Sequence, residues 1–165
     1  MSANGSWVRE GAVAGLIGAA AVAAWFFVID TIAGHPLYTP GLLGHALFSF
    51  FGSTVGESAT LHVAGYTVFH VLAFVAMGTL ASALIKASSF APAALAGLFM
   101  LFVAFQVAFY GVTAALALTD TLGGMAWWSI GVANLLAAVS MGRYLYREHP
   151  ELRHTLEVAL NGQEN

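Results

Sequence analysis

Six histidines give this chain of 165 residues its widest chemical range, because an imidazole can bind a metal, ligate haem iron or carry a proton. A haem in a helical bundle is commonly held by two axial ligands from facing helices. His62 and His70 lie on one predicted helix, about 12 Å of rise and about 80° of rotation apart, so they cannot hold one haem together. We therefore predict that a metal or haem uses His35, His45 and His62, or else His70 with a methionine.

Uncharged polar residues form a second set that could do chemistry. His70, Gln106 and Asn134 fall on three different predicted helices, and helix rise places all three roughly 13–18 Å below the same membrane boundary. Such groups are costly against lipid, so we expect them to face inward and to meet one another. Tyr66 and Tyr110 lie one helical turn from His70 and Gln106. The set indicates either a ligand pocket, for a quinone, pigment or small solute, or hydrogen bonds that fix the register of the bundle.

Other kinds of chemistry find no support in the sequence. It contains no cysteine, which excludes disulfides and thiolate metal sites. It also lacks the GxSxG, HExxH, P-loop and dinucleotide-binding motifs. His149 and His154 lie close to the C-terminus and are expected to be solvated surface residues. The sequence therefore favours a protein that is not an enzyme, and it implies no cofactor firmly.

The elements that must position these residues are long apolar segments. Hydrophobic residues make up 59% of the chain and charged residues only 8%, against about a quarter charged in a typical soluble domain. A helix that spans a bilayer needs about 20 mostly apolar residues. Four stretches meet this requirement, at about 7–33, 61–85, 91–118 and 125–146. They predict an all-α fold, a four-helix transmembrane bundle within residues 1–150, with a cytoplasmic tail at 151–165.

The basic residues give this bundle an orientation. In a four-span chain, all five would face the same side of the membrane: Arg9, Lys86, Arg143, Arg147 and Arg153. The opposite side, comprising residues 34–60 and 119–124, has no Lys or Arg. Because basic residues favour the cytoplasmic side, both termini are predicted to be cytoplasmic.

The loop between the first two spans is the largest segment predicted to lie outside the membrane. Its run GLLGHALFSFFG, residues 41–52, is too short to span and is expected to lie as a helix along the outer interface or over the mouth of the bundle. Asp30, Glu57 and Asp120 fall on the same side as His35, His45 and His62, so a divalent cation such as zinc is one possible ligand. Asp30 could instead cap the HPLYTP segment.

Small residues predict how the spans pack. Helices in lipid associate best where small residues let their backbones approach closely. The first span carries Gly11, Gly15 and Gly18, so we expect it to fit tightly against its neighbours. On the second span, six residues at steps of four mark one face: His62, Tyr66, His70, Phe74, Gly78 and Ser82.

Several runs of the sequence carry a resemblance to known proteins. They are WVREGAVAGLIGAAAVAAWFFVID, PLYTPGLLG, GYTVFH and the closing WW…NLLAA…MGRYL…HP. In these runs the chain resembles a group of small four-span bacterial membrane proteins that have no assigned activity. The resemblance implies a bacterial inner membrane, and it supplies no catalytic residues.

These observations lead to a functional hypothesis with two alternatives. The leading hypothesis is an accessory or structural subunit of a larger inner-membrane complex, in contact with the lipid bilayer and with other membrane subunits. The first alternative is a small redox protein that binds b-type haem or quinone, and the second is a solute-binding or ion-conducting oligomer. The net charge of −3 gives no reason to expect a nucleic-acid partner.

Overall fold

The computed structural model describes residues 6–52, 58–87 and 126–150, together with residues 97, 100, 102–104, 106–108, 110 and 111. Its elements are α1 (Ser6–Ile32), α2 (Tyr38–Phe50), α3 (Ala59–Ala87) and α5 (Ala126–Glu148). The described residues between 97 and 111 are helical as well. In this part of the chain there is no strand, so the all-α prediction is confirmed.

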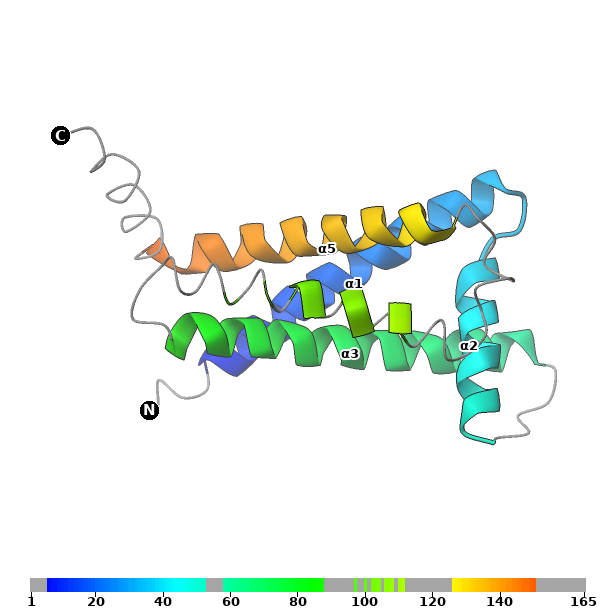
Figure 1. Ribbon diagram of the computed structural model, residues 1–165, viewed down its shortest axis with the longest axis horizontal. Helices are drawn as coiled ribbons and strands as arrows, with labels where there is room; N and C mark the ends of the chain where they lie inside the picture. The colour runs from blue at the N-terminus through cyan, green and yellow to red at the C-terminus, as the bar shows by residue number, and fades with distance from the viewer. Residues whose placement is uncertain are drawn as a thin grey trace.

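α1 runs antiparallel to α3 and α5, which run in the same direction as each other, and this gives the molecule two distinct ends (Figure 1). The start of α1 and the ends of α3 and α5 lie together, and we call this the terminal end. At the opposite end, α2 lies across α3, and we call this the α2 end. Between the two ends, α1 runs obliquely, from α3 at the terminal end toward α5 at the α2 end.

Two of the helices are long and apolar enough to cross a membrane. They are Trp7–Ile32, with 26 residues, and Ala59–Ala87, with 29 residues. Their bounds agree to within two residues with the spans predicted at 7–33 and 61–85. α5 is 23 residues long but is not among these candidates, and most of the span predicted at 91–118 lies outside the described residues, as does the tail at 151–165.

Local geometry explains where α1 ends and α2 begins. Gly34 adopts a positive φ of +82°, the left-handed conformation that commonly terminates a helix. The His35 N–H donates a hydrogen bond back to the Asp30 carbonyl at 2.9 Å, which closes the last turn. α2 follows after Leu37, so the helix expected within residues 41–52 is present and begins three residues earlier, at Tyr38.

The backbones of α1 and α3 approach each other very closely where the two helices cross, and we call this contact the glycine crossing. A Cβ atom placed on Gly11 would lie 2.5 Å from the Cα of Thr79, and one on Gly78 would lie 2.5 Å from the backbone nitrogen of Gly15. Only hydrogen atoms fit in such a space, so the two backbones touch directly. The tight packing predicted for the first span is confirmed.

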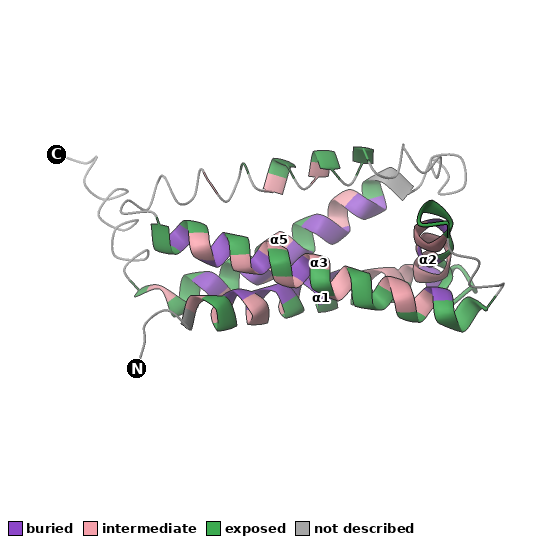
Figure 2. Cartoon of the chain, turned by 90° about the horizontal axis from the view of Figure 1, so that it is seen from below, coloured by how far each residue is buried: buried purple, intermediate pink, exposed green. Residues whose placement is uncertain are grey.

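Small residues also dominate the core between α1, α3 and α5 (Figure 2). One buried cluster comprises Ala19, Val22, Phe74, Ala133, Ala137 and Met141. A second, nearer the terminal end, comprises Ala14, Ala81, Ile85 and Leu145. Of the face predicted on the second span, His62, Phe74, Gly78 and Ser82 are buried. That face is therefore confirmed as the packing surface of α3.

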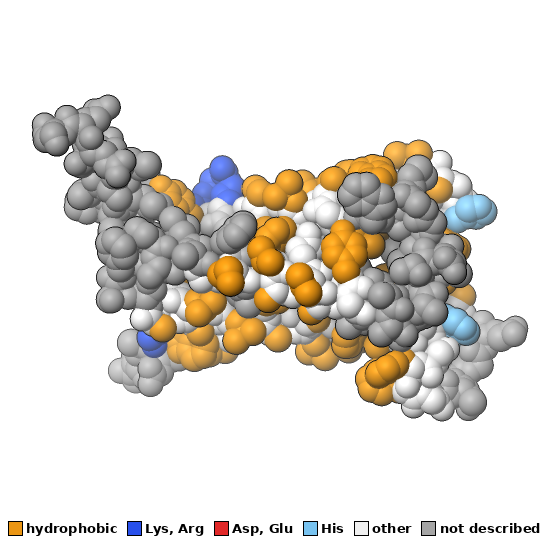
Figure 3. All heavy atoms as spheres, viewed as in Figure 1, with side chains coloured by type: hydrophobic (Ala, Val, Ile, Leu, Met, Phe, Trp, Pro, Cys, Tyr) orange, Lys and Arg blue, Asp and Glu red, His pale blue; other side chains and the backbone are white. Residues whose placement is uncertain are grey.

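Large apolar side chains point away from this core. Ile32 is 80% exposed, and Val68, Leu72 and Val139 are each about 60% exposed. Figure 3 shows hydrophobic side chains along the flank of the molecule, with Lys and Arg at the terminal end and histidines at the α2 end. On the face shown, the long side of the molecule is largely apolar, and the Lys, Arg and His side chains visible there lie toward the two ends.

The glycine crossing predicts a sharp difference between two alanine substitutions. Gly78→Ala puts a methyl group into the α3–α1 contact and is expected to lower the free energy of unfolding by about 1–3 kcal/mol, the usual cost of forcing extra volume into a packed site. Gly142→Ala on α5, where a Cβ meets nothing within 4 Å, is the matched control. It is expected to be neutral or to stabilise by up to about 1 kcal/mol. Thermal unfolding followed by circular dichroism in detergent measures both, and equal effects would contradict the role of the crossing.

Candidate functional site

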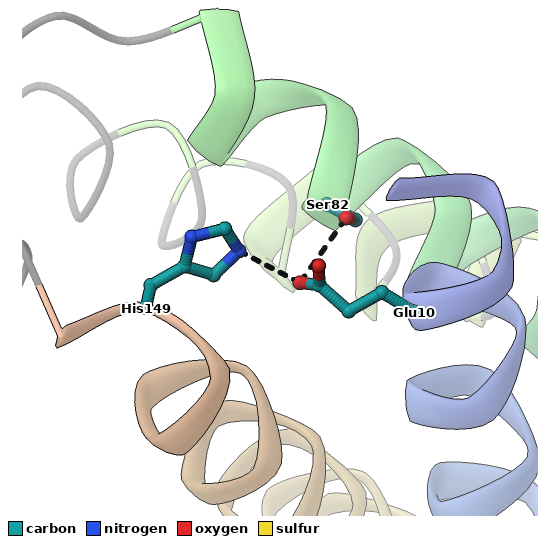
Figure 4. Close-up of polar contacts among 3 residues, drawn as sticks. All are labelled: Glu10, Ser82 and His149. Atoms are coloured by element: carbon teal, nitrogen blue, oxygen red, sulfur yellow. Dashed lines mark hydrogen bonds and ion pairs between the residues drawn. The ribbon is translucent and has the colours of Figure 1, made fainter. Parts of the chain in front are cut away.

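A polar cluster joins three helices at the terminal end (Figure 4). The Oε1 atom of Glu10 accepts hydrogen bonds from Ser82 Oγ at 3.3 Å and from His149 Nε2 at 2.7 Å. Glu10 comes from the start of α1, Ser82 from the last part of α3, and His149 directly follows α5. The Glu10 and His149 side chains are only 14% and 18% exposed, and Ser82 is fully buried. We call this group the Glu10 clamp.

The order of the groups in the Glu10 clamp differs from that of a catalytic triad. In a triad the histidine lies between the serine and the carboxylate, so that it can take the proton of the serine. Here the carboxylate lies between Ser82 and His149. Ser82 has no exposed surface, so a substrate has no access to its hydroxyl. The cluster is therefore arranged to hold three helices together and is unsuited to nucleophilic catalysis.

The Glu10 clamp corrects one prediction and contains one residue, Glu10, that the sequence did not bring forward. His149 was expected to be solvated, which is wrong, because it forms an ion pair with Glu10 when protonated. His154 lies outside the described residues. The feature of the sequence that points to Glu10 is its acidic side chain, near the start of a mostly apolar helix. Ser82 is the last residue of the packing face of α3, but the spacing of residues in the sequence does not identify Glu10 as its partner.

The polar residues predicted to meet at mid-depth divide into two groups. Asn134 Nδ2 donates a hydrogen bond to Gln106 Oε1, which ties α5 to the helical residues 106–108. Tyr110 lies on the same side, with its hydroxyl 4.0 Å from the position of a Cβ on Gly131. His70 belongs to the other group, because its Nε2 donates to the Ala19 carbonyl of α1 at 3.3 Å.

His70 lies in a row of rings along α3. Its ring centroid is 5.6 Å from that of Tyr66 and 4.8 Å from that of Phe74. The planes of the His70 and Tyr66 rings are inclined to each other by 31°. The structure thus brings Gln106 and Asn134 together, and separately His70 and Tyr66.

An apolar groove of about 330 Å³ lies beside this second group, between α1 and α3. Its α1 wall includes Ala19, Ala20 and Ala23, and its α3 wall includes Tyr66 and His70. The first turn of α2 closes it at the α2 end. The groove follows from the oblique course of α1 in Figure 1: after the glycine crossing, α1 leans toward α5 and away from the outer half of α3.

Asp30 fixes the position of α2 at the end of this groove. It is 4% exposed, and its two oxygens accept hydrogen bonds from the Thr39 backbone N–H at 2.8 Å and the Thr39 hydroxyl at 2.7 Å. α2 has no side-chain cap of its own at Leu37, so an acidic residue of α1 binds a free N–H of its first turn. The prediction that Asp30 caps the HPLYTP segment is confirmed.

The histidines at the α2 end contact each other through their rings. His45 and His62 are T-shaped, with centroids 5.1 Å apart, and Phe48 lies 5.8 Å from His62. His35 is exposed, and no three His, Asp or Glu side chains of the described residues gather as a metal site. Glu57 and Asp120 lie outside that part of the chain, so the haem and metal hypotheses stay predictions.

These features define a class of protein. Its described residues are helical apart from short turns, they include two helices able to cross a membrane, and most of their side-chain hydrogen bonds join different helices. Comparison of the chain with protein-family models, with curated proteins and with solved structures finds no match.

The Glu10 clamp predicts a coupled loss of stability. Glu10→Ala removes the shared acceptor, leaves the buried Ser82 hydroxyl unpaired, and is expected to lower the free energy of unfolding by about 1.5–3 kcal/mol. His149→Ala is expected to cost less, and to add little in the Glu10→Ala background because both changes break the same contact. The matched control is Glu148→Ala, which removes an exposed carboxylate one residue from the clamp. Unfolding measured in detergent tests this, and additive effects of Glu10→Ala and His149→Ala would contradict it.

Proposed function

We propose that this chain is a four-span protein of a bacterial inner membrane that acts as a non-catalytic accessory or structural subunit of a larger membrane complex. The observation that carries the proposal is the use of its polar side chains. Most of the described polar side chains with hydrogen bonds bind across helix contacts, to one another or to the backbone of a neighbouring helix, while three threonines bind within their own helix.

Four contacts support this interpretation, and each joins different helices. They are Asn134 with Gln106, His70 with the Ala19 carbonyl, Trp25 Nε1 with the Ser129 carbonyl at 3.1 Å, and the Glu10 clamp. Among the described residues, no buried side-chain nitrogen or oxygen lacks a hydrogen-bond partner. Within a membrane such bonds contribute roughly 0.6 kcal/mol each and help to fix the register of helices. A bundle held in this way is suited to a scaffolding role.

The exposed surface supports an environment of lipid and partner helices. Leu16, Phe27 and Val28 on α1 and Val68 and Leu72 on α3 are all at least half exposed. A soluble protein rarely exposes contiguous apolar surface of this kind, because water disfavours it. In a bilayer the same surface is covered by hydrocarbon or by another subunit.

The charge distribution supports an orientation with both termini in the cytoplasm. Lys86 Nζ lies 5.8 Å from the centre of the Trp7 ring, so the basic ends of α1 and α3 adjoin. Arg147 is in the last turn of α5, next to His149 of the Glu10 clamp. The described residues of the α2 end, 33–52 and 58, contain no Lys or Arg. The terminal end would therefore face the cytoplasm.

The accessory role predicts that the protein travels with companions. Extraction of native membranes in mild detergent, followed by native mass spectrometry, is expected to find the chain in a defined assembly larger than itself or its own homo-oligomer. An inert membrane protein of similar size, expressed at the same level, controls for chance association. If the chain is recovered alone or only with copies of itself, the accessory role is wrong.

The four-span topology has a direct test because the chain contains no cysteine. Single cysteines at Ser49 and at Thr121, in the predicted outer turn, are expected to react with a membrane-impermeant maleimide in intact cells whose outer membrane has been opened. Cysteines at Ala87 and Arg147 are expected to react only after the inner membrane is broken. Protection of the Thr121 cysteine in intact cells would indicate two spans and overturn the four-span arrangement.

A further inference from the structure

The groove between α1 and α3 combines apolar walls with hydrogen-bonding groups far from either end. His70 lies eleven residues into α3, roughly 16 Å along the helix from Ala59. Its Nε2 is bound to the Ala19 carbonyl, so in the neutral ring Nδ1 remains as an acceptor. Tyr66 lines the groove beside it and brings a hydroxyl that can donate and accept.

The other polar residues of the groove are already engaged. The hydroxyl of Thr67 donates to the Val63 carbonyl at 2.7 Å. Both oxygens of Asp30 bind Thr39. This leaves Tyr66 and His70 as the polar groups that face a ligand, next to walls formed by alanine, leucine, valine and phenylalanine side chains.

The charge and depth of the groove select among membrane molecules. Its lining contains no Lys or Arg, so nothing in it attracts a phosphate headgroup. A phospholipid also keeps its headgroup at the membrane interface, whereas Tyr66 and His70 lie toward the middle of α3. A ligand that matches must carry an uncharged polar group into the bilayer and must have an apolar tail.

We propose that this groove binds the ring of a membrane quinone. The ring is flat, and the rings of Tyr66 and His70, whose planes are inclined to each other by 31°, offer it an aromatic surface to pack against. The Tyr66 hydroxyl donates to a quinone carbonyl oxygen, and His70 Nδ1 accepts from a quinol hydroxyl. A volume of about 330 Å³ is at the lower end of the range for small-molecule sites and fits a ring with the first part of its tail.

The proposal concerns binding only, and the chain need not transfer electrons. It rests on the membrane location proposed above but not on the accessory role. A chain that binds quinone while travelling alone would overturn the accessory role and leave this inference intact. If the chain is found in a large assembly and its groove binds no quinone, the accessory role is supported and this inference is wrong.

The test uses the full chain in nanodiscs of phosphatidylethanolamine and phosphatidylglycerol that contain no quinone. The probe is a quinone with one isoprene unit and a photoreactive azide on its ring. We expect labelled peptides from α1 and α3 at the groove, and we expect excess unlabelled quinone to abolish the labelling. An isoprenoid alcohol of the same length, which has no ring, is expected not to compete.

Variants locate the site. Ala23→Trp fills the groove from an exposed position and is expected to reduce labelling at least tenfold, while Ala76→Trp, on an exposed part of α3 outside the groove, leaves it unchanged. Tyr66→Phe keeps the ring, removes one hydrogen bond, and is expected to weaken binding about 2–10-fold. Circular dichroism of each variant checks that it folds. Equal labelling in Ala23→Trp and Ala76→Trp, or equal competition by the alcohol, would overturn the proposal.

Discussion

No side chain separates α1 from α3 where Gly11 and Gly15 meet Gly78, and the rest of the described fold depends on how close this brings the two backbones. Dispersion forces between main-chain atoms act at full strength at this distance, which matters in lipid, where apolar burial gives helices little reason to associate. Two straight helices that touch at one point must diverge from it when their axes are inclined. α1 therefore reaches α5 at the α2 end, and the space that it leaves beside α3 becomes the groove.

Polar contacts stabilise this arrangement at three depths. The Glu10 clamp closes the terminal end, the Asn134–Gln106 pair and the His70–Ala19 contact act near the middle, and Asp30 holds α2 at the far end. A small polar contribution at each depth prevents the helices from sliding past one another, which apolar packing between similar small residues resists poorly. Glycine and alanine residues thus determine the distances between the helices, and polar side chains determine the register of one helix against another.

Much of this could be predicted from the sequence, because apolar length and glycine spacing are local properties. The ends of α1 and α3, the packing face of α3 and the cap by Asp30 follow from residues near one another in the chain. Depth could be predicted from helix rise, so Gln106 and Asn134 were correctly paired. The rotation of each helix about its own axis could not be predicted, because it depends on the direction in which α1 crosses its neighbours. For this reason His70 binds the backbone of Ala19 and does not meet Gln106 or Asn134. The Glu10–His149 contact joins residues 139 positions apart and has no local signature.

That long separation has a consequence for how the chain is made. Glu10 leaves the ribosome before the residues of α3 and α5, while His149 is added only after every helix of the described fold has been synthesised. Until then the carboxylate has Ser82 as its one helix-bound partner in the clamp. Closure of the clamp is thus possible only after α1, α3 and α5 have all been synthesised.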